Sequence, residues 1–426
     1  MPPPRCPPNQ LHAAAGRGNE RMVLAQLAKG CHIDQGTPTG CTALIIAAGE
    51  GHPRVVRALL KKGANFWVTA DGGGSALHAA SHQGHLAVAI ELVKAGAALE
   101  QKDSRGKTPL HVATIEGRWG VMRMLIEAGA NADSREVEGS TPLYSAAWQG
   151  HMDAIKVLLR AKADPLLQRT NSSSGMTSVP LDAAALNGHC EAVKELVQQL
   201  GIMGCGGASG GAHALKLAAE INRADIMGVL TGAGVIDSTG IALIVAAEFC
   251  HEAAVKCLVA HHGGKNGSGF RYTNHRSKTG RTALFNAIIF SRPSPRIVRL
   301  LVDAGADATT TVRVLDASGG LTNTTPLGLT ADLLRKNEMG GKDASEERRH
   351  RLEAIRRLLL RLEAVHARSW LWWSGDASLG VHTAEKSVTK KAPSVPLVSM
   401  LPVLRLRASK NGVVLVPLFR YSRKRR

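Results

Sequence analysis

Thr108-Pro109-Leu110-His111-Val112-Ala113 is the stretch of this 426-residue chain that decides its fold. The Thr108 hydroxyl is suited to cap a helix, and Pro109 suits the first helical position because its φ is preset and it has no N–H to satisfy. Gly117 is able to end this helix in the left-handed conformation, and Val121, Leu125 and Ile126 mark the apolar side of a second helix. We therefore predict two short helices followed by a loop.

This unit recurs at a constant interval of 33 residues. Three series share the interval: Leu11, Leu44, Leu77, Leu110 and Leu143; Gly18, Gly51, Gly84, Gly117 and Gly150; and Gly30, Gly63, Gly96 and Gly129. Beyond the fifth unit the spacing loosens, and the extra residues fall at Asn171–Gly175 and Asp316–Thr324, where loops are expected. The predicted units start near residues 9, 42, 75, 108, 141, 179, 213, 241, 282 and 325.

Three motifs closely resemble the ankyrin repeat family: Thr108-Pro109-Leu110-His111, Gly84-His85 and Gly129-Ala130-Asn131. The resemblance covers residues 9–310 and continues in weaker form to residue 365. It implies an all-α solenoid of stacked helix-turn-helix units with β-hairpin-like loops. On this basis residues 1–8 form a Pro-rich N-terminal segment, 9–365 the solenoid, and 366–426 a weakly ordered C-terminal tail.

Two substitutions test the glycine pattern. Asn222 replaces the helix-ending Gly of the seventh unit, and Lys162 replaces the second such Gly of the fifth. Asn tolerates the left-handed conformation next best after Gly, whereas Lys predicts strain or an altered loop path.

The last unit resembles a capping repeat. We predict a first helix from Thr325-Pro326-Leu327, a polar insert over Lys336–Ala344, and a second helix that starts at Asp343 with Glu346 completing a capping box. Its apolar stripe and its outward-facing arginines are expected at two sets of positions: Leu352, Ile355, Leu359, Leu362 and Val365 for the stripe, and Arg348, Arg349, Arg356 and Arg357 for the outer side.

The residue pattern favours a non-enzymatic protein without a cofactor, a metal or a small-molecule substrate. The resemblance explains the recurrent histidines, because His12, His78 and His111 follow the Leu of the first helix, where the family uses His to bond the loop and the helix start. The remaining recurrent histidines follow the helix-ending glycine: His52, His85, His151 and His189. The Gly-rich stretch from Gly204 to Gly211 lacks the Gly-Lys-Ser/Thr of a phosphate-binding loop and is predicted to be an inter-repeat loop.

The resemblance also implies where a partner protein binds, namely the concave face made by loop tips and by the ends of the first helices. The helix-end positions are Gly49, Glu50, His82, Gln83, Ile115, Glu116, Trp148, Gln149, Leu186 and Asn187. The loop positions are Pro38, Thr39, Asp71, Ser104, Arg105, Lys107, Val137 and Glu138.

Ile115, Trp148 and Leu186 occupy equivalent positions in three successive units, at places where the fold does not require apolar side chains. We hypothesise that they form a binding hot spot, because binding energy concentrates on such anchors. The alternative is that Trp148 covers a neighbouring loop or helix.

The C-terminal fifth carries most of the net charge of +19, since residues 342–426 hold 19 Lys and Arg against 7 Asp and Glu. Trp370-Leu371-Trp372-Trp373 is expected to cover the end of the stack, with membrane-interface or partner docking as the alternative. Asn411-Gly412 lies between two apolar runs and predicts a hairpin turn. The patch Arg423-Lys424-Arg425-Arg426 suggests nuclear import or polyanion binding.

Two functions follow as competing hypotheses. The first is an intracellular scaffold or adaptor, in the cytoplasm or also in the nucleus, that binds a partner protein on the concave face. The second is a protein whose basic tail binds nucleic acid or an anionic membrane. The scattered cysteines favour a reducing compartment, and neither a secretory signal nor a transmembrane run is recognised in the sequence.

Overall fold

The computed structural model describes ten stretches of the chain: residues 8–170, 175–205, 211–262, 272–277, 279–289, 293–315, 321–339, 345–374, 404–409 and 412–417. The chain divides into two compact units, Met1–Ser369 and Trp370–Arg426.

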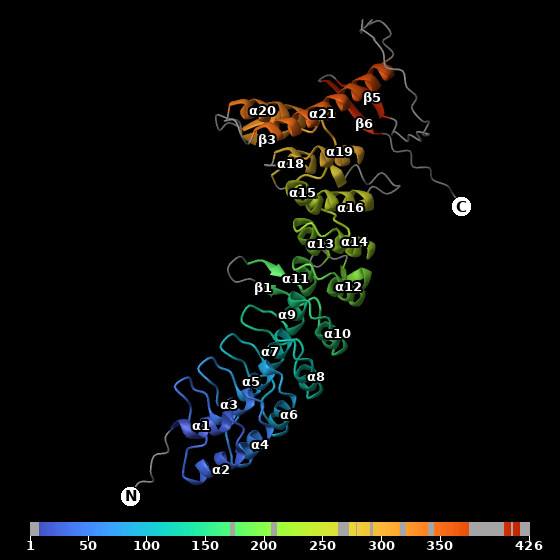
Figure 1. Ribbon diagram of the computed structural model, residues 1–426. Coiled ribbons are helices and arrows are strands. Elements are labelled where there is room, and N and C mark those ends of the chain that lie inside the picture. The colour runs from blue at the N-terminus through green and yellow to red at the C-terminus, as the bar shows by residue number, and fades with distance from the viewer. Residues whose placement is uncertain are drawn as a thin grey trace, which may run out of the picture. The chain divides into compact units, whose positions relative to one another are not determined.

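The first compact unit is a stack of helix pairs (Figure 1). The first helices are α1 (Pro8–Gly16), α3 (Ala43–Gly49), α5 (Ala76–Gln83), α7 (Pro109–Ile115), α9 (Pro142–Gln149), α11 (Pro180–Leu186), α13 (Gly211–Glu220), α15 (Ile241–Glu248), α18 (Ala283–Ile289) and α20 (Pro326–Met339). The second helices are α2 (Glu20–Ala28), α4 (Pro53–Lys61), α6 (Leu86–Lys94), α8 (Trp119–Glu127), α10 (Met152–Arg160), α12 (Cys190–Cys205), α14 (Ala224–Gly232), α16 (Glu252–His262), α19 (Pro295–Asp303) and α21 (Ser345–Ser374).

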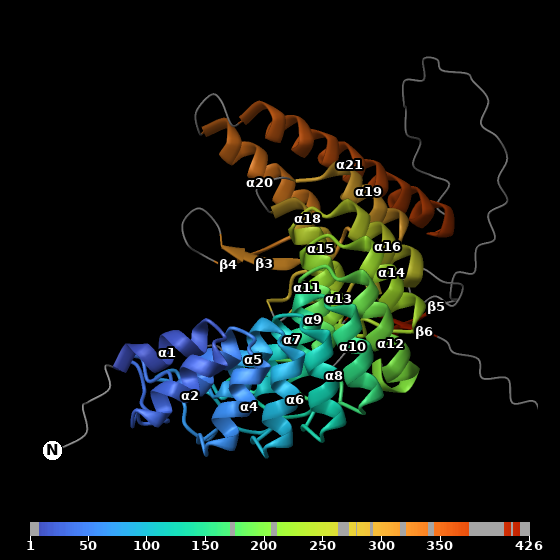
Figure 2. The same ribbon diagram turned by 60° about the horizontal axis from the view of Figure 1, so that its bottom comes forward.

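These helices form two layers (Figure 2). Each first helix from α1 to α20 packs against the next first helix, and each second helix from α2 to α19 packs against the next second helix. The predicted all-α solenoid is therefore confirmed.

One leucine per unit fills the space between the layers. Leu110 and Leu143 are 0% exposed, and the series continues into the irregular units with Leu181, Leu215, Leu243 and Leu284, also 0% exposed. Because burying a leucine side chain contributes about 1.5–3 kcal/mol, we expect this series to be a main source of cohesion between units, together with the second-helix leucines, which are also 0% exposed: Leu59, Leu92, Leu125 and Leu158.

Left-handed residues end the helices even where glycine is missing. Lys162 has φ 63°, Asn222 has φ 59°, and Cys250 in the eighth unit also has φ 59°. Cys250 lies nine residues after Ile241, which is the place that Gly51 takes after Thr42. The left-handed conformation costs about 1–2 kcal/mol at a non-glycine residue. The turn between the helices therefore imposes this conformation even on residues that disfavour it.

The last helix pair differs from its prediction in two places. The helix α20 continues through Lys336 to Met339, so these four residues are helical and do not begin a polar insert. The helix α21 extends to Ser374, past Val365, because no glycine or proline interrupts the sequence before Gly375. The predicted cap at Asp343 lies outside the described residues.

The apolar stripe of α21 is confirmed at its centre. Leu352, Ile355 and Leu359 are 0% exposed, and Leu362 packs partly buried against the same core. Arg349, Arg356 and Arg357 are exposed as predicted, whereas Arg348 is half-buried.

Two of the irregular inter-unit loops form short antiparallel hairpins. Strands β1 (Arg169–Thr170) and β2 (Thr177–Ser178) flank the first predicted insertion, and β3 (Val312–Leu315) pairs with β4 (Leu321–Thr324) around the second. In the second compact unit, β5 (Leu404–Ser409) pairs with β6 (Gly412–Pro417), and Ser409 lies opposite Gly412. A hairpin is therefore present as predicted, but Gly412 is the first residue of β6 and not part of the turn.

Histidines hold neighbouring units together. The Nε2 atom of His78 donates to the carbonyl oxygen of Lys107 at 2.9 Å, and that of His111 donates to Ser140 at 3.1 Å. The other ring nitrogen, Nδ1, accepts the backbone N–H of Ser75 in the first case and of Thr108 in the second. Both rings are therefore bound in the neutral form.

The glycine-following histidines make a second set of links. His52 donates to the carbonyl oxygen of Gly16 at 2.9 Å, His85 to Gly49 at 3.0 Å, and His189 to Trp148 at 3.1 Å. These bonds give the histidines the scaffold role that the family resemblance implied for His78 and His111.

The buried histidines predict acid sensitivity. Burial lowers the pKa of His78 and of His111 below the ordinary 6.5, so the folded state favours neutral rings. Their contribution to stability is complete above pH 6.5 and is lost as the pH falls through the folded-state pKa. We expect the wild-type free energy of unfolding to fall more steeply between pH 7 and pH 5 than that of a His78→Gln/His111→Gln variant. Equal slopes in chemical denaturation would contradict this assignment.

Candidate protein-binding surface

The loop tips of the first five units are joined by backbone hydrogen bonds. The N–H of Asp71 donates to the carbonyl of Thr39 at 3.2 Å, that of Ser104 to Gly72 at 3.1 Å, and that of Val137 to Arg105 at 3.1 Å. Within one tip, Gly73 donates to Ala70 at 2.7 Å and Ala70 to Gly74 at 3.0 Å, which closes a tight turn. These turns are the β-hairpin-like loops that the sequence predicted, and their ladder places the exposed tip side chains in a row.

Gly73 is the position where this ladder is most sensitive to substitution. It has φ +75°, and an added Cβ would lie 2.6 Å from the backbone nitrogen of Ser104. We expect Gly73→Ala to destabilise the chain by about 1–2 kcal/mol from its φ alone, and further by the backbone clash. Gly63→Ala is the matched control, because Gly63 has φ +86° with nothing within 4 Å. Equal losses in urea titrations of the two variants would show that the close approach of the tips is unimportant.

The ends of three first helices bring the predicted hot-spot residues to one side. Trp148 is 40% exposed and Leu186 is 38% exposed, and their helices α9 and α11 pack side by side. Ile115 ends the adjacent helix α7 but is half-buried, so the prediction of an exposed side chain is wrong for this residue. Two apolar anchors therefore remain open to a partner.

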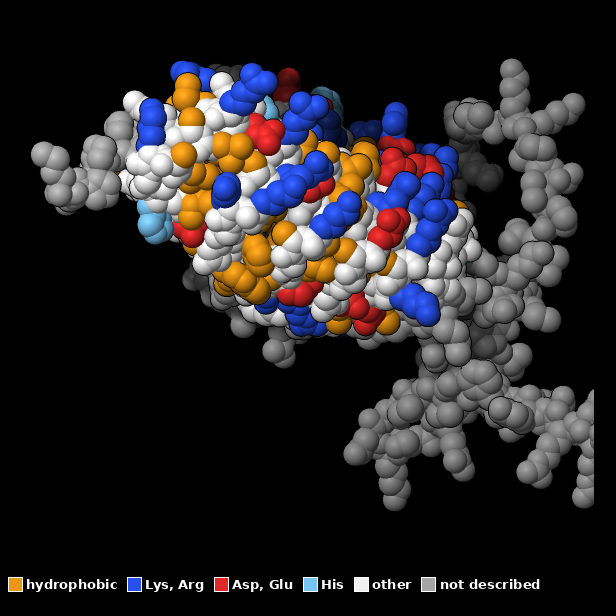
Figure 3. Space-filling view, turned by 90° about the horizontal axis from the view of Figure 1, so that it is seen from below, with side chains coloured by type: hydrophobic (Ala, Val, Ile, Leu, Met, Phe, Trp, Pro, Cys, Tyr) orange, Lys and Arg blue, Asp and Glu red, His pale blue; other side chains and the backbone are white. Residues whose placement is uncertain are grey.

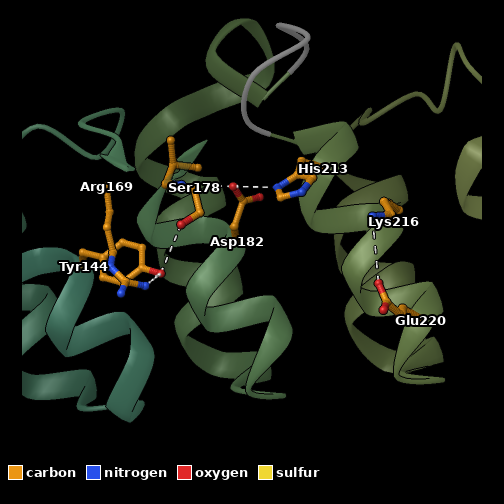
Figure 4. A network of polar contacts seen from close by, with 8 residues as sticks. Tyr144, Arg169, Ser178, Asp182, His213, Lys216 and Glu220 are labelled. Carbon is orange, nitrogen blue, oxygen red and sulfur yellow. Dashed lines mark hydrogen bonds and ion pairs between the residues drawn. The ribbon is translucent and has the colours of Figure 1, made fainter. Parts of the chain in front are cut away.

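Trp148 is also supported from below. Its ring stacks on Tyr144, one helical turn earlier, with centroids 6.4 Å apart and planes at 21°. Tyr144 is buried, and its hydroxyl lies 3.1 Å from the Ser178 Oγ (Figure 4). The guanidinium of Arg169 lies 5.5 Å from the Tyr144 ring centre and pairs with Glu138. Trp148 thus packs on a residue of its own helix and also presents exposed surface.

The next junction uses a different polar contact (Figure 4). Asp182 stands where three of the five earlier units have His, is 1% exposed, and accepts the Val179 N–H at 3.0 Å. The Nδ1 atom of His213 in the following unit lies 3.0 Å from the same oxygen. The hydrogen bond to Asp182 raises the pKa of His213, and burial opposes this shift. This junction is therefore stabilised at low pH and weakens as the pH rises through the His213 pKa, the opposite of His78 and His111.

The other predicted contact residues are largely accessible. Lys107 is half-buried like Ile115, since its carbonyl group is bound by His78. Gly49 is also half-buried, and the other fifteen of the eighteen predicted residues are exposed, namely Pro38, Thr39, Glu50, Asp71, His82, Gln83, Ser104, Arg105, Glu116, Val137, Glu138, Trp148, Gln149, Leu186 and Asn187. The surface combines apolar anchors with charges of both signs.

The exposed apolar residues that sequence reasoning missed include Phe249, Met176 and Trp67. Phe249 is 51% exposed and occupies the helix-end position of the eighth unit, which a continued count of the repeat would have found. Met176, 58% exposed, lies in the insertion between β1 and β2, where no repeat position exists. Trp67 is 58% exposed at a loop position that other units fill with acidic residues such as Asp34.

Other candidate sites are limited. Among the described stretches, side chains of His, Cys, Asp and Glu do not gather in groups of three that could hold a metal ion. Within the same stretches, no helix is both long and apolar enough to cross a membrane. The basic patch Arg423-Lys424-Arg425-Arg426, the weak order expected of residues 375–403 and 418–426, and the side chains of Trp370–Trp373 lie outside what the structure describes.

Comparisons with known proteins agree with this architecture. No curated protein matches the chain. A family profile described as ankyrin repeats (3 copies) matches residues 11–103, 77–169, 134–203 and 183–312. These matches span more than half of the sequence and coincide with the helix pairs from α1 to α19, so the chain belongs to the ankyrin repeat family.

Proposed function

We propose that this chain is a non-enzymatic scaffold or adaptor that binds a partner protein on the surface formed by its loop tips and first-helix ends. Ankyrin repeats are generally protein–protein interaction modules. The observation that carries the proposal for this chain is the exposure of Trp148 and Leu186 on adjacent helices.

The chemistry of this surface suits a folded protein or an ordered segment. A tryptophan supplies a large contact area at a low cost in conformational entropy, and tryptophans are enriched among residues that dominate binding energy. The Tyr144 stack and the Arg169–Glu138 pair support Trp148 before binding. Glu116, Gln149 and Val137 on the same predicted surface are also exposed.

The proposal predicts a site-specific loss of partner binding. We expect Trp148→Ala/Leu186→Ala to weaken binding by more than tenfold, because each truncation at a hot spot costs about 2 kcal/mol or more. The measurement is quantitative affinity capture with the full chain, followed by titration of the captured protein. Leu166→Ala, which removes a 44% exposed leucine elsewhere, is the matched control. Retained affinity in the double variant, with its melting temperature unchanged, would refute this assignment of the site.

A further inference from the structure

The second helices of the first five units carry a concentrated positive charge. We count these helices with their following cap residues, as 20–29, 53–62, 86–95, 119–128 and 152–162. They contain eleven Lys and Arg against four Asp and Glu, whereas the rest of residues 8–170 contains seven against ten. All eleven basic side chains are exposed, and we call the surface they form the basic face.

The basic charge is mostly uncompensated. Of the eleven, Arg57 alone forms an ion pair within the described residues, with Glu91 at 2.7 Å. Figure 3, seen from below relative to Figure 1, shows long Lys and Arg side chains lying across the surface with fewer acidic ones between them. Glu195 on α12 marks the end of the row, where it lines a groove with Lys156 and Arg160.

The fold itself does not require this charge. Four of the five later second helices, α12, α14, α16 and α19, pack in the same layer but together contain four Lys and Arg against five Asp and Glu, whereas the last, α21, contains seven Arg against four Glu. Lys61 and Lys94 lie in last turns, where the helix dipole favours cations. Arg21 and Arg54 lie in first turns, where the dipole disfavours them. Helix stabilisation therefore does not account for the full set.

We propose that the basic face binds the phosphate backbone of a nucleic acid. Consecutive second helices from α2 to α10 pack side by side, so the cations form a row, and a row of cations matches a linear polyanion. Contacts of Lys and Arg to phosphates fix position without reading the sequence, which suits a face made of flexible cations.

Two other occupants fit the basic face less well. A partner protein is disfavoured because Lys is depleted in protein interfaces, whereas six of the eleven residues are Lys. An anionic membrane is disfavoured because interfacial binding needs a broad apolar surface, and the large apolar side chains exposed on these helices are Met22, at 47%, and Leu86, at 39%.

The test uses two fluorescein-labelled duplexes of 20 base pairs, one of DNA and one of RNA. Fluorescence anisotropy measures the binding of each duplex to the full chain at several salt concentrations. We expect Arg54→Glu/Lys61→Glu/Lys62→Glu to weaken duplex binding at least tenfold. We also expect the slope of log K against log salt to decrease by roughly 3 for three lost phosphate contacts. The matched control changes the same net charge at exposed sites off the basic face, as Arg17→Glu/Arg135→Glu/Arg276→Glu, and should stay within twofold of wild type.

Three results would overturn the proposal. The first is an equal loss of duplex affinity in the two triple variants. The second is an unchanged slope of log K against log salt in the Arg54→Glu/Lys61→Glu/Lys62→Glu variant. The third is that this variant loses binding to phosphatidylserine vesicles while its duplex binding stays intact. Circular dichroism melting checks that each variant is folded. If the first variant is unfolded, Lys61→Gln/Lys62→Gln replaces it and should weaken binding several-fold, and unchanged affinity of this folded variant also contradicts the proposal.

Discussion

Leu143→Ala is expected to lower the free energy of unfolding by about 2–5 kcal/mol, because it opens a cavity in the middle of the stack. Leu143 is 0% exposed in α9, and α9 packs against both α7 and α11. In a solenoid each unit contacts only its neighbours, so a weakened central unit separates the two sides of the stack. We therefore expect a second transition in chemical denaturation followed by circular dichroism.

Leu166→Ala removes the same atoms from a side chain that is 44% exposed, and is expected to cost no more than about 0.5 kcal/mol. If Leu143→Ala were as stable as Leu166→Ala, the 33-residue leucine series would not be a main source of cohesion.

Phe285→Ala is expected to cost about 3–5 kcal/mol and to act on one end of the stack. Phe285 is 0% exposed in α18, and α18 packs against α15, α19 and α20. Nearest-neighbour coupling predicts that the C-terminal helix pairs lose protection while the N-terminal units keep theirs. Hydrogen–deuterium exchange by mass spectrometry should show fast exchange in α18, α19 and α20 and unchanged exchange in α3 and α5. Faster exchange throughout the chain would mean that the stack unfolds as a single cooperative body.

Much of the fold was predictable because the repeat is redundant. Leu110, Gly117 and their counterparts in other units each indicate the same helix pair, so the repeat remains recognisable when one of these residues is replaced. The structure shows this at Lys162 and Cys250, which adopt positive φ in place of glycine. The helix boundaries near Lys336 and Val365 were not predictable, since they depend on where the next glycine falls and polar residues there are compatible with either a helix or a loop.

The candidate site was predictable only as a set of positions. Repeat position indicates that residue 148 lies near a helix end, but the Tyr144 stack depends on side-chain packing across several residues. Ile115 and Leu186 are equivalent in sequence, yet one is half-buried and the other exposed. Met176 was missed because an insertion carries no repeat position.

The basic face shows a further limit of sequence reasoning. The net charge of residues 1–341 is small relative to their length, because acidic residues in the segments between helices offset the Lys and Arg of the early second helices. Arg54 and Lys61 on α4 lie in the same helix layer as Lys94 on α6, and this can be recognised only from the arrangement of the helices. Charge balance therefore has to be read by layer and not by segment.

The central claim is that a partner protein contacts the surface that contains Trp148. Hydroxyl-radical footprinting of the full chain, alone and saturated with the captured partner, measures side-chain exposure at each residue. The account predicts that oxidation of Trp148, Leu186 and Val137 falls several-fold on binding, while that of Met22 and Leu86 on the second helices is unchanged. Protection of Met22 and Leu86, with Trp148 oxidised as fast as in the free chain, would contradict the account.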